Sequence, residues 1–361
     1  MIGPHLASSV GTTFLDSDDG PDSGLLCREL KWLMEDAIED HTVFSQMGIE
    51  NNQTNVRLRM GIEELYNLWK QRIEERRPFQ YLVGCEHWRD LVLSVQDGVL
   101  IPRPETELIV DLVADVVSNN EGLREGLWAD FGTGSGALAI GIGRILGSCG
   151  RVIATDLSPV ALSVAAFNVQ KYGLQLSEFI IDVIELRQGS WFKPLKDLEG
   201  KLAGIVSNQP YILSDNIPGL QAEVGRHEPR VALDGGINGI NDLLHLCNGA
   251  ALMLRPGGFF IFEICELQKV EPWCDDKCLP PKATGCGFGS GNQPLLTSLG
   301  GKNGTPHFLE SKGTEGSFPR LQHRHNPCFK NWTGLTSSTR NRAPIRSGKF
   351  PKTCIKPVKT R

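Results

Sequence analysis

The sequence lacks the long apolar run that a membrane-spanning helix requires. None of its hydrophobic stretches approaches the ~20 residues needed to cross a bilayer. Residues 1–19 contain no basic segment followed by an apolar core, which argues against a secretory signal. They are acidic and contain no arginine, which argues against an organellar transit peptide. The ten cysteines follow no disulfide-framework spacing, which favours a reducing compartment. We therefore expect an intracellular, soluble protein with no membrane partner.

Basic charge is also scarce, except in the last quarter of the chain. From Gln268 onward there are 16 Lys and Arg against 5 Asp and Glu, whereas the preceding residues carry 21 against 37. Proteins that bind nucleic acid usually carry a basic footprint. The acidic part of the chain therefore lacks the charge of a nucleic-acid-binding protein, and direct contact with nucleic acid is expected only through the basic tail.

The tail also lacks any persistent helical or strand periodicity. Residues 268–361 are polar and rich in Gly, Ser and Thr, a composition that predicts disorder. We therefore expect a foreign, altered end that leaves an edge of the fold exposed. The spacing of its cysteines and histidines matches no standard zinc pattern, so no metal is expected at Cys274, Cys278, Cys286, His307 or His323.

The remainder of the chain divides by pattern into helical and alternating parts. Apolar residues recur at helical spacing over 23–38 and again over 62–75, which predicts a small helical domain. Strands and helices then alternate, which predicts a parallel, doubly wound sheet. The expected organisation is a disordered segment at 1–22, a helical domain at 23–78, a connector with a β-hairpin at 79–100, an α/β domain at 101–267 and the disordered tail at 268–361.

The stretch from Leu127 to Gly136 predicts a strand, a tight turn and a helix start. Three glycines alternate with Thr133 and Ser135, and glycine permits positive φ and close approach of a ligand to the backbone. A second predicted strand ends at Asp156, where a carboxylate can accept the hydroxyls of a ribose. These features predict a nucleoside-cofactor site at the carboxyl edge of the sheet.

The spacing of the glycines narrows the choice of cofactor. Gly132, Gly134 and Gly136 follow a G-x-G-x-G pattern, which differs from the dinucleotide G-x-G-x-x-G pattern and lacks the lysine of a P-loop. Asp130 adds a negative charge beside the turn. A cofactor with positive charge and no phosphate suits this turn, and S-adenosylmethionine fits that description best.

A second motif lies after the strand that is predicted to end at Ser207. Asn208, Gln209, Pro210 and Tyr211 follow it, at the sheet edge where ligands bind in open α/β folds. The asparagine amide offers one acceptor for a substrate –NH2 group, and the tyrosine offers a flat face for a planar group. This motif is therefore the predicted catalytic site.

Several motifs together resemble the HemK-type N5-glutamine methyltransferases, and most closely their plant and bacterial members. The matching elements between about residues 23 and 266 are Gln80–Gly84, Ile101–Glu107, Asp130–Gly136, Asp156, Gly189–Trp191, Ser207–Ile212, Glu223–Pro229 and Leu233–Gly239. The resemblance implies a Rossmann-like class I methyltransferase fold with a small N-terminal helical domain, at 23–78, that docks the substrate. It also implies methylation of the GGQ glutamine in peptide-chain release factors, which would be the protein partner of a monomeric enzyme working in a plastid, a mitochondrion or the cytoplasm.

Site residues are carried over from the resemblance by position. The cofactor contacts fall on Asp130, Gly132, Thr133, Gly134, Ser135, Gly136, Asp156, Trp191 and Asn208. The substrate-amide contacts fall on Asn208, the carbonyl of residue 209 and Tyr211. The motif has no evident general base, so the resemblance and the weak nucleophilicity of an amide suggest catalysis by positioning.

Gln209 departs from the family motif Asn-Pro-Pro-Tyr, in which a proline holds this place. Loss of the proline ring loosens the turn, and the Gln209 amide can compete for the place of the substrate. We expect weakened activity, and a Gln209→Pro change is expected to raise turnover.

Two alternative functions stay open on the sequence alone. An N6-adenine methyltransferase uses a similar motif for another planar –NH2, although the acidic core argues against nucleic acid as the substrate. A splice or frameshift variant that binds the cofactor without turnover is favoured by Gln209 and by the foreign tail. Incubation with labelled cofactor and either a release factor or DNA separates these functions.

Overall fold

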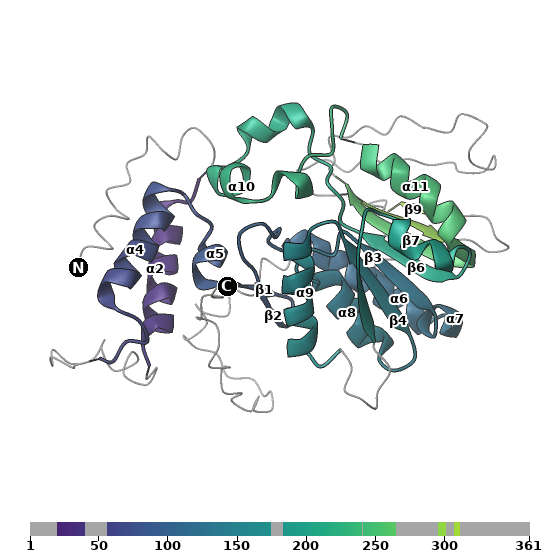
Figure 1. Ribbon diagram of the computed structural model, residues 1–361, viewed down its shortest axis with the longest axis horizontal. Helices are drawn as coiled ribbons and strands as arrows, with labels where there is room; N and C mark the ends of the chain where they lie inside the picture. The colour runs from purple at the N-terminus through teal and green to yellow at the C-terminus, as the bar shows by residue number, and fades with distance from the viewer. Residues whose placement is uncertain are drawn as a thin grey trace, which may run out of the picture.

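The protein consists of a helix pair beside a larger α/β unit (Figure 1). The structure is a computed structural model that describes residues 20–39, 56–174, 183–239, 241–264, 295–300 and 307–310. The predicted disordered segment 1–22 lies almost wholly outside the described residues. In these residues no helix is both long enough and apolar enough to cross a membrane.

The helix pair consists of α2 (Ser23–Ala37) and α4 (Ile62–Glu74). Asp22 caps α2 by accepting a 2.6 Å hydrogen bond from the Leu25 backbone N–H. The apolar stripes seen in the sequence face one another and form a small core that includes Leu26, Leu33 and Trp69. The helical prediction for both segments therefore holds, because each stripe is buried by the other helix.

A short connector joins the helix pair to the α/β unit. It contains α5 (Phe79–Val83) and an antiparallel hairpin of β1 (Cys85–Trp88) and β2 (Leu91–Ser94). Two side chains of the connector hold the segment that follows the hairpin. The Tyr81 hydroxyl donates a 2.6 Å hydrogen bond to the Val99 carbonyl, and the Trp88 indole donates one of 2.7 Å to the Arg103 carbonyl. These bonds fix the path of the chain through residues 99–103 into the α/β unit.

The α/β unit is built on one sheet with strand order β5-β4-β3-β6-β7-β8-β9. The first five strands in this order are parallel and comprise β5 (Ile184–Gln188), β4 (Arg151–Asp156), β3 (Leu127–Phe131), β6 (Leu202–Ser207) and β7 (Leu254–Ile264). The order reverses direction between β3 and β6, and such a switch point opens a crevice at the carboxyl ends of the strands. This arrangement confirms the predicted doubly wound fold.

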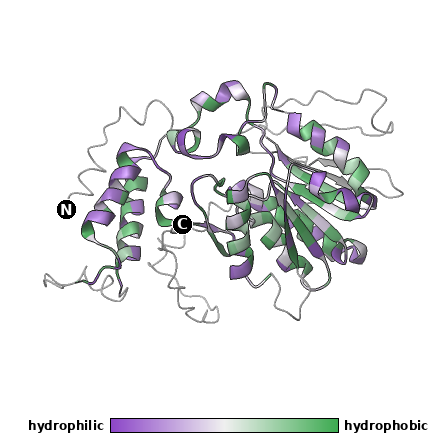
Figure 2. Ribbon diagram, viewed as in Figure 1, coloured by the Kyte–Doolittle hydropathy of each residue, from purple (hydrophilic) through white to green (hydrophobic). Residues whose placement is uncertain are grey.

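Both faces of the sheet are covered by helices. The strand residues alternate between two cores: Trp128 and Phe259 belong to one, whereas Ala129 and Phe260 belong to the other. Figure 2 shows the strands as largely hydrophobic and the helices as hydrophilic on their outer sides. The main helices of the unit are α6 (Glu107–Ser118), α8 (Ala137–Leu146), α9 (Pro159–Lys171) and α11 (Asn241–Met253).

Short helical segments occupy the connections of the unit. Several of them lie in the long connection between β6 and β7, beyond the carboxyl edge of the sheet (Figure 1). The short segments are η1 (Pro104–Thr106), α7 (Glu121–Arg124), η2 (Lys193–Leu198), η3 (Ser214–Gly219), α10 (Ala222–His227) and η4 (Arg230–Ala232).

Two strands lie within residues 268–361, where the sequence predicts a disordered tail. β8 (Leu295–Gly300) pairs antiparallel with β7, and β9 (His307–Glu310) pairs antiparallel with β8. Without β8, the outer edge of β7 would present unpaired N–H and C=O groups, which favours pairing with any segment able to extend. The expectation of disorder is therefore corrected for these ten residues. The rest of the tail lies outside the described residues.

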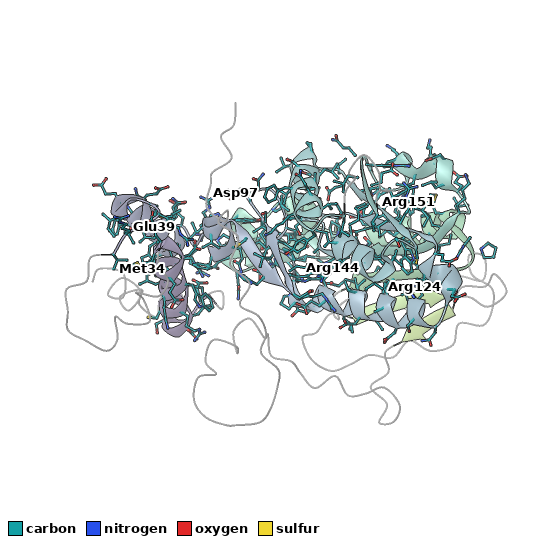
Figure 3. All side chains as sticks on the ribbon, turned by 90° about the horizontal axis from the view of Figure 1, so that it is seen from below. Met34, Glu39, Asp97, Arg124, Arg144 and Arg151 are labelled. Carbon is teal, nitrogen blue, oxygen red and sulfur yellow. The ribbon has the colours of Figure 1, made fainter. Side chains whose placement is uncertain are left out.

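Buried ion pairs join the helix pair to the α/β unit. Glu223 of α10 accepts hydrogen bonds from Arg72 of α4 and from Arg76, at distances between 2.5 and 2.8 Å. Arg72 also binds Glu29 of α2 at 2.7 Å. On the surface, Arg77 forms an exposed pair with Asp97, which lies between the two parts in Figure 3. The two parts are therefore held together by charged side chains as well as by the chain itself.

Candidate active site

The glycine turn begins where β3 ends. Gly132, Gly134 and Gly136 have φ angles of 70°, 56° and 86°, a region that favours glycine. The backbone N–H groups of Gly132 and Thr133 both donate to the Thr155 carbonyl at 2.9 Å, which fastens the turn to β4. A Cβ added at Gly132 or Gly134 would meet no atom within 4 Å. The turn therefore leaves open space at its surface, as a cofactor-binding turn requires.

Asp130 lies buried beneath this turn. Its Oδ2 accepts hydrogen bonds from the Thr133 hydroxyl at 2.6 Å and from the Ala139 backbone N–H at 3.1 Å. Among the described residues, its Oδ1 has no hydrogen-bond partner. Burial, and to a smaller extent the nearby Asp156 carboxylate, raises the pKa of Asp130 to about 7, although the hydrogen bonds from Thr133 and Ala139 act to lower it. A cationic group placed beside Asp130 would favour its ionised form, so the site suits a positively charged ligand.

Asp156 lies at the carboxyl end of β4, opposite the turn. Its Oδ2 accepts from the Gly134 N–H at 2.9 Å, and its Oδ1 accepts from the Ser158 N–H at 2.8 Å. Burial raises the pKa of Asp156, while these backbone hydrogen bonds lower it. Each carboxylate oxygen keeps a further lone pair, so both remain able to accept a ribose hydroxyl. The structure thus places Asp156 against the glycine turn, and its role toward a ribose stays a prediction.

Trp191 enters the same edge from the segment that follows β5. The Gly189 N–H donates a 3.0 Å hydrogen bond to the Asp156 carbonyl, which brings this segment to the end of β4. Trp191 has a φ of 49°, uncommon for a residue with a side chain, and its ring lies 5.9 Å from the His245 ring. The tryptophan is thus half-buried between the cofactor edge and α11.

The remaining residue of the turn, Ser135, is buried and held through its backbone. Asn168 of α9 donates a 2.9 Å hydrogen bond to the Ser135 carbonyl. The structure therefore brings together, at the ends of β3, β4 and β5, the cofactor residues predicted from sequence: Asp130, Gly132, Thr133, Gly134, Ser135, Gly136, Asp156 and Trp191.

The second motif begins directly beside the first. Ser207 ends β6, and its hydroxyl donates a 2.9 Å hydrogen bond to the Phe131 carbonyl at the end of β3. Asn208 follows, and its Nδ2 donates to the Thr106 hydroxyl at 2.9 Å. No donor among the described residues reaches the Asn208 Oδ1. The asparagine therefore has one end of its amide held and the acceptor end free, as expected for a residue that grips a substrate –NH2 group.

Tyr211 and a buried glutamate complete the motif. The Tyr211 hydroxyl donates to the Glu263 Oε1 at 3.0 Å, and the Thr106 hydroxyl donates to the Glu263 Oε2 at 2.7 Å. Glu263 is 1 % exposed and lies near the end of β7. Sequence analysis placed Thr106 only within a family motif and gave Glu263 no role. The signal available was a glutamate within the otherwise apolar run of residues 259–264, which marks a buried charge that needs partners.

Gln209 does not lie where the sequence analysis expected competition with the substrate. Its side chain is buried, and its Nε2 donates a 2.6 Å hydrogen bond to the Glu263 backbone carbonyl. Its Oε1 has no partner among the described residues. The amide is thus turned into the protein, where it ties the motif to β7. The expectation that it occupies the place of the substrate is corrected, because a nearby carbonyl supplies a better partner.

A glycine-rich loop supports the motif from behind. Ile212 pairs with Asp234 in a parallel bridge, and the Gly235 N–H donates to the Ile212 carbonyl at 2.8 Å. A Cβ at Gly235 would lie 2.8 Å from the Tyr211 Cα and 2.9 Å from the Pro210 carbonyl oxygen. Only glycine therefore permits this loop to press against the Pro210–Tyr211 backbone and fix its position.

The strand order and the paired motifs at the switch point define the class of the protein, a Rossmann-like methyltransferase. The family model described as ribosomal protein L11 methyltransferase (PrmA) matches residues 104–228. A release factor glutamine methyltransferase of Thermosynechococcus vestitus is 42% identical over 213 residues, covering 59% of this chain and 70% of that protein. One from Synechocystis is 39% identical over 247 residues, covering 68% and 80%. One from Gloeobacter violaceus is 44% identical over 206 residues, covering 57% and 68%.

The chain belongs to the release factor glutamine methyltransferase family. This assignment confirms the resemblance drawn from the sequence motifs. Among solved structures, a ribosomal protein L11 methylase of Lactobacillus delbrueckii is similar at 25% identity and a TM-score of 0.31, covering 48% of this chain and 67% of that one. The cysteines and His323 considered as zinc ligands lie outside the described residues, so the absence of a metal stays a prediction.

Proposed function

We propose that the chain transfers the methyl group of S-adenosylmethionine to the side-chain nitrogen of a glutamine in a peptide-chain release factor, the GGQ glutamine of the family. The names of its relatives support the reaction and the substrate. The observation that carries the proposal is the Asn208 amide beside the open glycine turn: its Nδ2 is held by Thr106, whereas no donor in the described part of the chain reaches its Oδ1.

The cofactor end of the site is assigned to the residues around the glycine turn. Gly132 and Gly134 give the cofactor close access to the backbone, and Asp156 accepts its ribose hydroxyls. The Asp130 Oδ1 beneath the turn, which has no hydrogen-bond partner in the described ranges, supplies negative potential for a cationic cofactor when the carboxyl is ionised. Trp191 contributes an aromatic wall on the side of β5. When bound, S-adenosylmethionine supplies a methyl group on a positively charged sulfur, which leaves as a neutral thioether.

The substrate end is assigned to Asn208, the carbonyl of residue 209 and Tyr211. An amide nitrogen is a weak nucleophile, because its lone pair is delocalised into its carbonyl. The Asn208 Oδ1 and the residue 209 carbonyl accept hydrogen bonds from the substrate –NH2 group and hold it in line with the methyl carbon. Transfer to this nitrogen would be balanced by cleavage of the carbon–sulfur bond of the cofactor and by loss of one proton from the nitrogen to water. Acceptors on that nitrogen also stabilise the positive charge it gains in the transition state.

A substrate panel tests this function. The full chain is incubated with methyl-labelled cofactor and, in parallel, with a release factor, the same release factor with its GGQ glutamine changed to alanine, and DNA. We expect label only in the unaltered release factor, and loss of that label in the Asn208→Ala variant. Label in DNA would instead support the adenine methyltransferase. Cofactor binding without any transfer would support the inactive variant considered from the sequence.

The oligomeric state, any contact with nucleic acid and the cellular compartment stay predictions. A monomer is expected, and light scattering during gel filtration measures this directly. Direct nucleic-acid contact is expected only through the basic tail. The compartment, whether plastid, mitochondrion or cytoplasm, is decided by imaging a fluorescent fusion of the complete gene product.

A further inference from the structure

One set of hydrogen bonds beneath the substrate motif links residues that are far apart in the sequence. Thr106 comes from η1, Asn208 follows β6 and Glu263 lies in β7. The Thr106 hydroxyl contacts both of the others, at 2.9 Å from the Asn208 Nδ2 and 2.7 Å from the Glu263 Oε2. Thr106 and Glu263 are 4 % and 1 % exposed, so both lie away from bulk water.

In this set of hydrogen bonds, the ionised carboxylate determines which group donates and which accepts. An ionised carboxylate can only accept hydrogen bonds, so the Thr106 hydroxyl must donate its one proton to Glu263. That hydroxyl then has only lone pairs to offer Asn208, so Asn208 must turn its –NH2 toward Thr106. The Asn208 Oδ1 consequently faces away from Thr106, as the acceptor that a substrate –NH2 group needs. If the Asn208 amide were reversed, its own –NH2 would face the substrate –NH2, and two groups that can only donate would meet.

We propose that Glu263, acting through the hydroxyl of Thr106, is the positioning residue that sets which end of the Asn208 amide faces the substrate. The inference rests on the proposed function, and it assigns to Thr106 and Glu263 a role at the same site. Tyr211 is held by the same carboxylate, since its hydroxyl donates to the other oxygen of Glu263 at 3.0 Å. One buried charge therefore orders both substrate-facing side chains of the motif.

The arrangement depends on Glu263 being ionised. A protonated Glu263 has a proton to donate, so one of the two hydroxyls loses its acceptor, and Thr106 becomes free to donate toward Asn208. Burial raises the pKa of Glu263, whereas the hydrogen bonds from Thr106 and Tyr211 lower it. Of the charged groups nearby, Glu105 raises it further and Arg103, itself paired with Glu228, lowers it. Turnover should therefore fall on the acid side, as the pH drops through the raised pKa of Glu263.

The first test compares Thr106→Val with Thr106→Ser. Valine keeps the shape of threonine but removes the hydroxyl, whereas serine keeps the hydroxyl. We expect kcat with the release factor to fall about tenfold or more in Thr106→Val and to remain within about threefold of the wild type in Thr106→Ser. The KM for release factor and the Kd for cofactor, measured by calorimetry, should change little in either variant. Equal turnover in the two variants would overturn the proposal.

The second test removes the titrating group with Glu263→Gln. The glutamine carbonyl can still accept from Thr106 while its –NH2 donates to the Tyr211 oxygen, so the variant can keep the same hydrogen-bond pattern without a group that titrates. The shape of its own pH profile is the readout, whatever its kcat at neutral pH. We expect the acid limb of the kcat profile, present in the wild type, to disappear in this variant. An acid limb that persists unchanged would contradict the assignment to Glu263.

A third readout does not need turnover, and it separates failure of this inference from failure of the proposed function. The side-chain –NH2 of Asn208 is followed by nuclear magnetic resonance in asparagine-labelled protein, assigned by its disappearance in Asn208→Ala. We expect its signals to shift as the pH is lowered in the wild type, to stay constant in Glu263→Gln and to be displaced in Thr106→Val. Signals that respond alike in all three proteins would overturn the inference, even if release-factor methylation were established. The expected pattern in a protein that methylates no release factor would reject only the proposed function.

Discussion

Gln209 shows how a single residue can substitute for proline by a different physical means. A proline at this place stiffens the turn through its ring, whereas Gln209 ties the turn to β7 through a 2.6 Å hydrogen bond to the Glu263 carbonyl. The two solutions differ in cost. The glutamine leaves its Oε1 buried without a partner among the described residues, and an unsatisfied buried acceptor costs about 1–3 kcal/mol.

Two substitutions at this position separate the anchoring role from obstruction of the substrate. Gln209→Ala removes the tether without adding stiffness, so we expect kcat to fall several-fold while the Kd for cofactor is unchanged. Gln209→Pro restores a rigid turn and removes the unpaired Oε1, so we expect turnover to rise above that of the wild type. Steady-state kinetics with release factor measures both. An alanine variant faster than the wild type would show that the glutamine obstructs the site, as its sequence position alone suggested.

Individual residues also show how far sequence reasoning reaches. The glycine turn and Asp156 could be predicted, because positive φ angles and a carboxylate at a strand end leave local signatures in the sequence. The direction of the Gln209 side chain could not, since it depends on the Glu263 carbonyl, 54 residues away. Glu263 was overlooked for the same reason: its partners come from η1 and from the segment after β6, and only the folded sheet brings them together.

Among the elements, β6 depends on one glycine for its fit against β3. A Cβ at Gly204 would lie 2.2 Å from the Cε3 atom of Trp128, a ring that is fully buried. The Trp128 indole is also fixed by a 2.8 Å hydrogen bond to the Leu123 carbonyl, so the ring cannot easily move aside. The position of β6, which leads directly into Asn208, therefore depends on Gly204 having no side chain.

We expect Gly204→Ala to lower the free energy of unfolding by about 1–3 kcal/mol, the range for an overpacked core. Denaturant unfolding measures the change. The matched control is Gly219→Ala in η3, where an added Cβ meets no atom within 4 Å and stability should change little. Equal stability of the two variants would contradict the close packing of β6 against Trp128.

The apolar pattern of the sequence predicted the helices and the parallel strands but missed the pairing of β8 with β7. The helices and parallel strands follow apolar periodicities that depend only on which face is buried, and these were predicted. The pairing of β8 with β7 has no such signature in residues 295–300, because backbone groups at a sheet edge can pair with segments of many sequences.

At the scale of the whole molecule, the position of the helix pair depends on Glu223. Its carboxylate receives hydrogen bonds from Arg72 and Arg76, two guanidinium groups whose side chains are 3% and 5% exposed. Burial acts to raise the pKa of Glu223, but the hydrogen bonds from Arg76 and Arg72 outweigh it and hold the pKa below its usual value. A carboxyl whose pKa is lowered by folding stabilises the protein above its unfolded pKa, and this stabilisation is lost as the pH falls through its folded pKa.

We expect Glu223→Gln to destabilise the protein by about 3–5 kcal/mol at neutral pH, because it removes the carboxylate that the two buried guanidinium groups of Arg72 and Arg76 share. The difference from the wild type should shrink on the acid side of the usual glutamate range, where the wild-type carboxyl also becomes neutral. Thermal unfolding across pH measures this. If the helix pair docks the release factor, the variant should also raise the KM for that protein without changing the Kd for cofactor. A difference in stability that does not depend on pH would contradict the role of the Glu223 charge.

The most direct test of the account is to locate the methyl group on the product. A release factor is incubated with the full chain and S-adenosylmethionine, and the peptide that contains its GGQ glutamine is analysed by fragmentation mass spectrometry. The account predicts one added methyl group on the side-chain nitrogen of that glutamine, and none when Asn208 is changed to alanine. An unmodified glutamine, or a methyl group on any other residue, would contradict it.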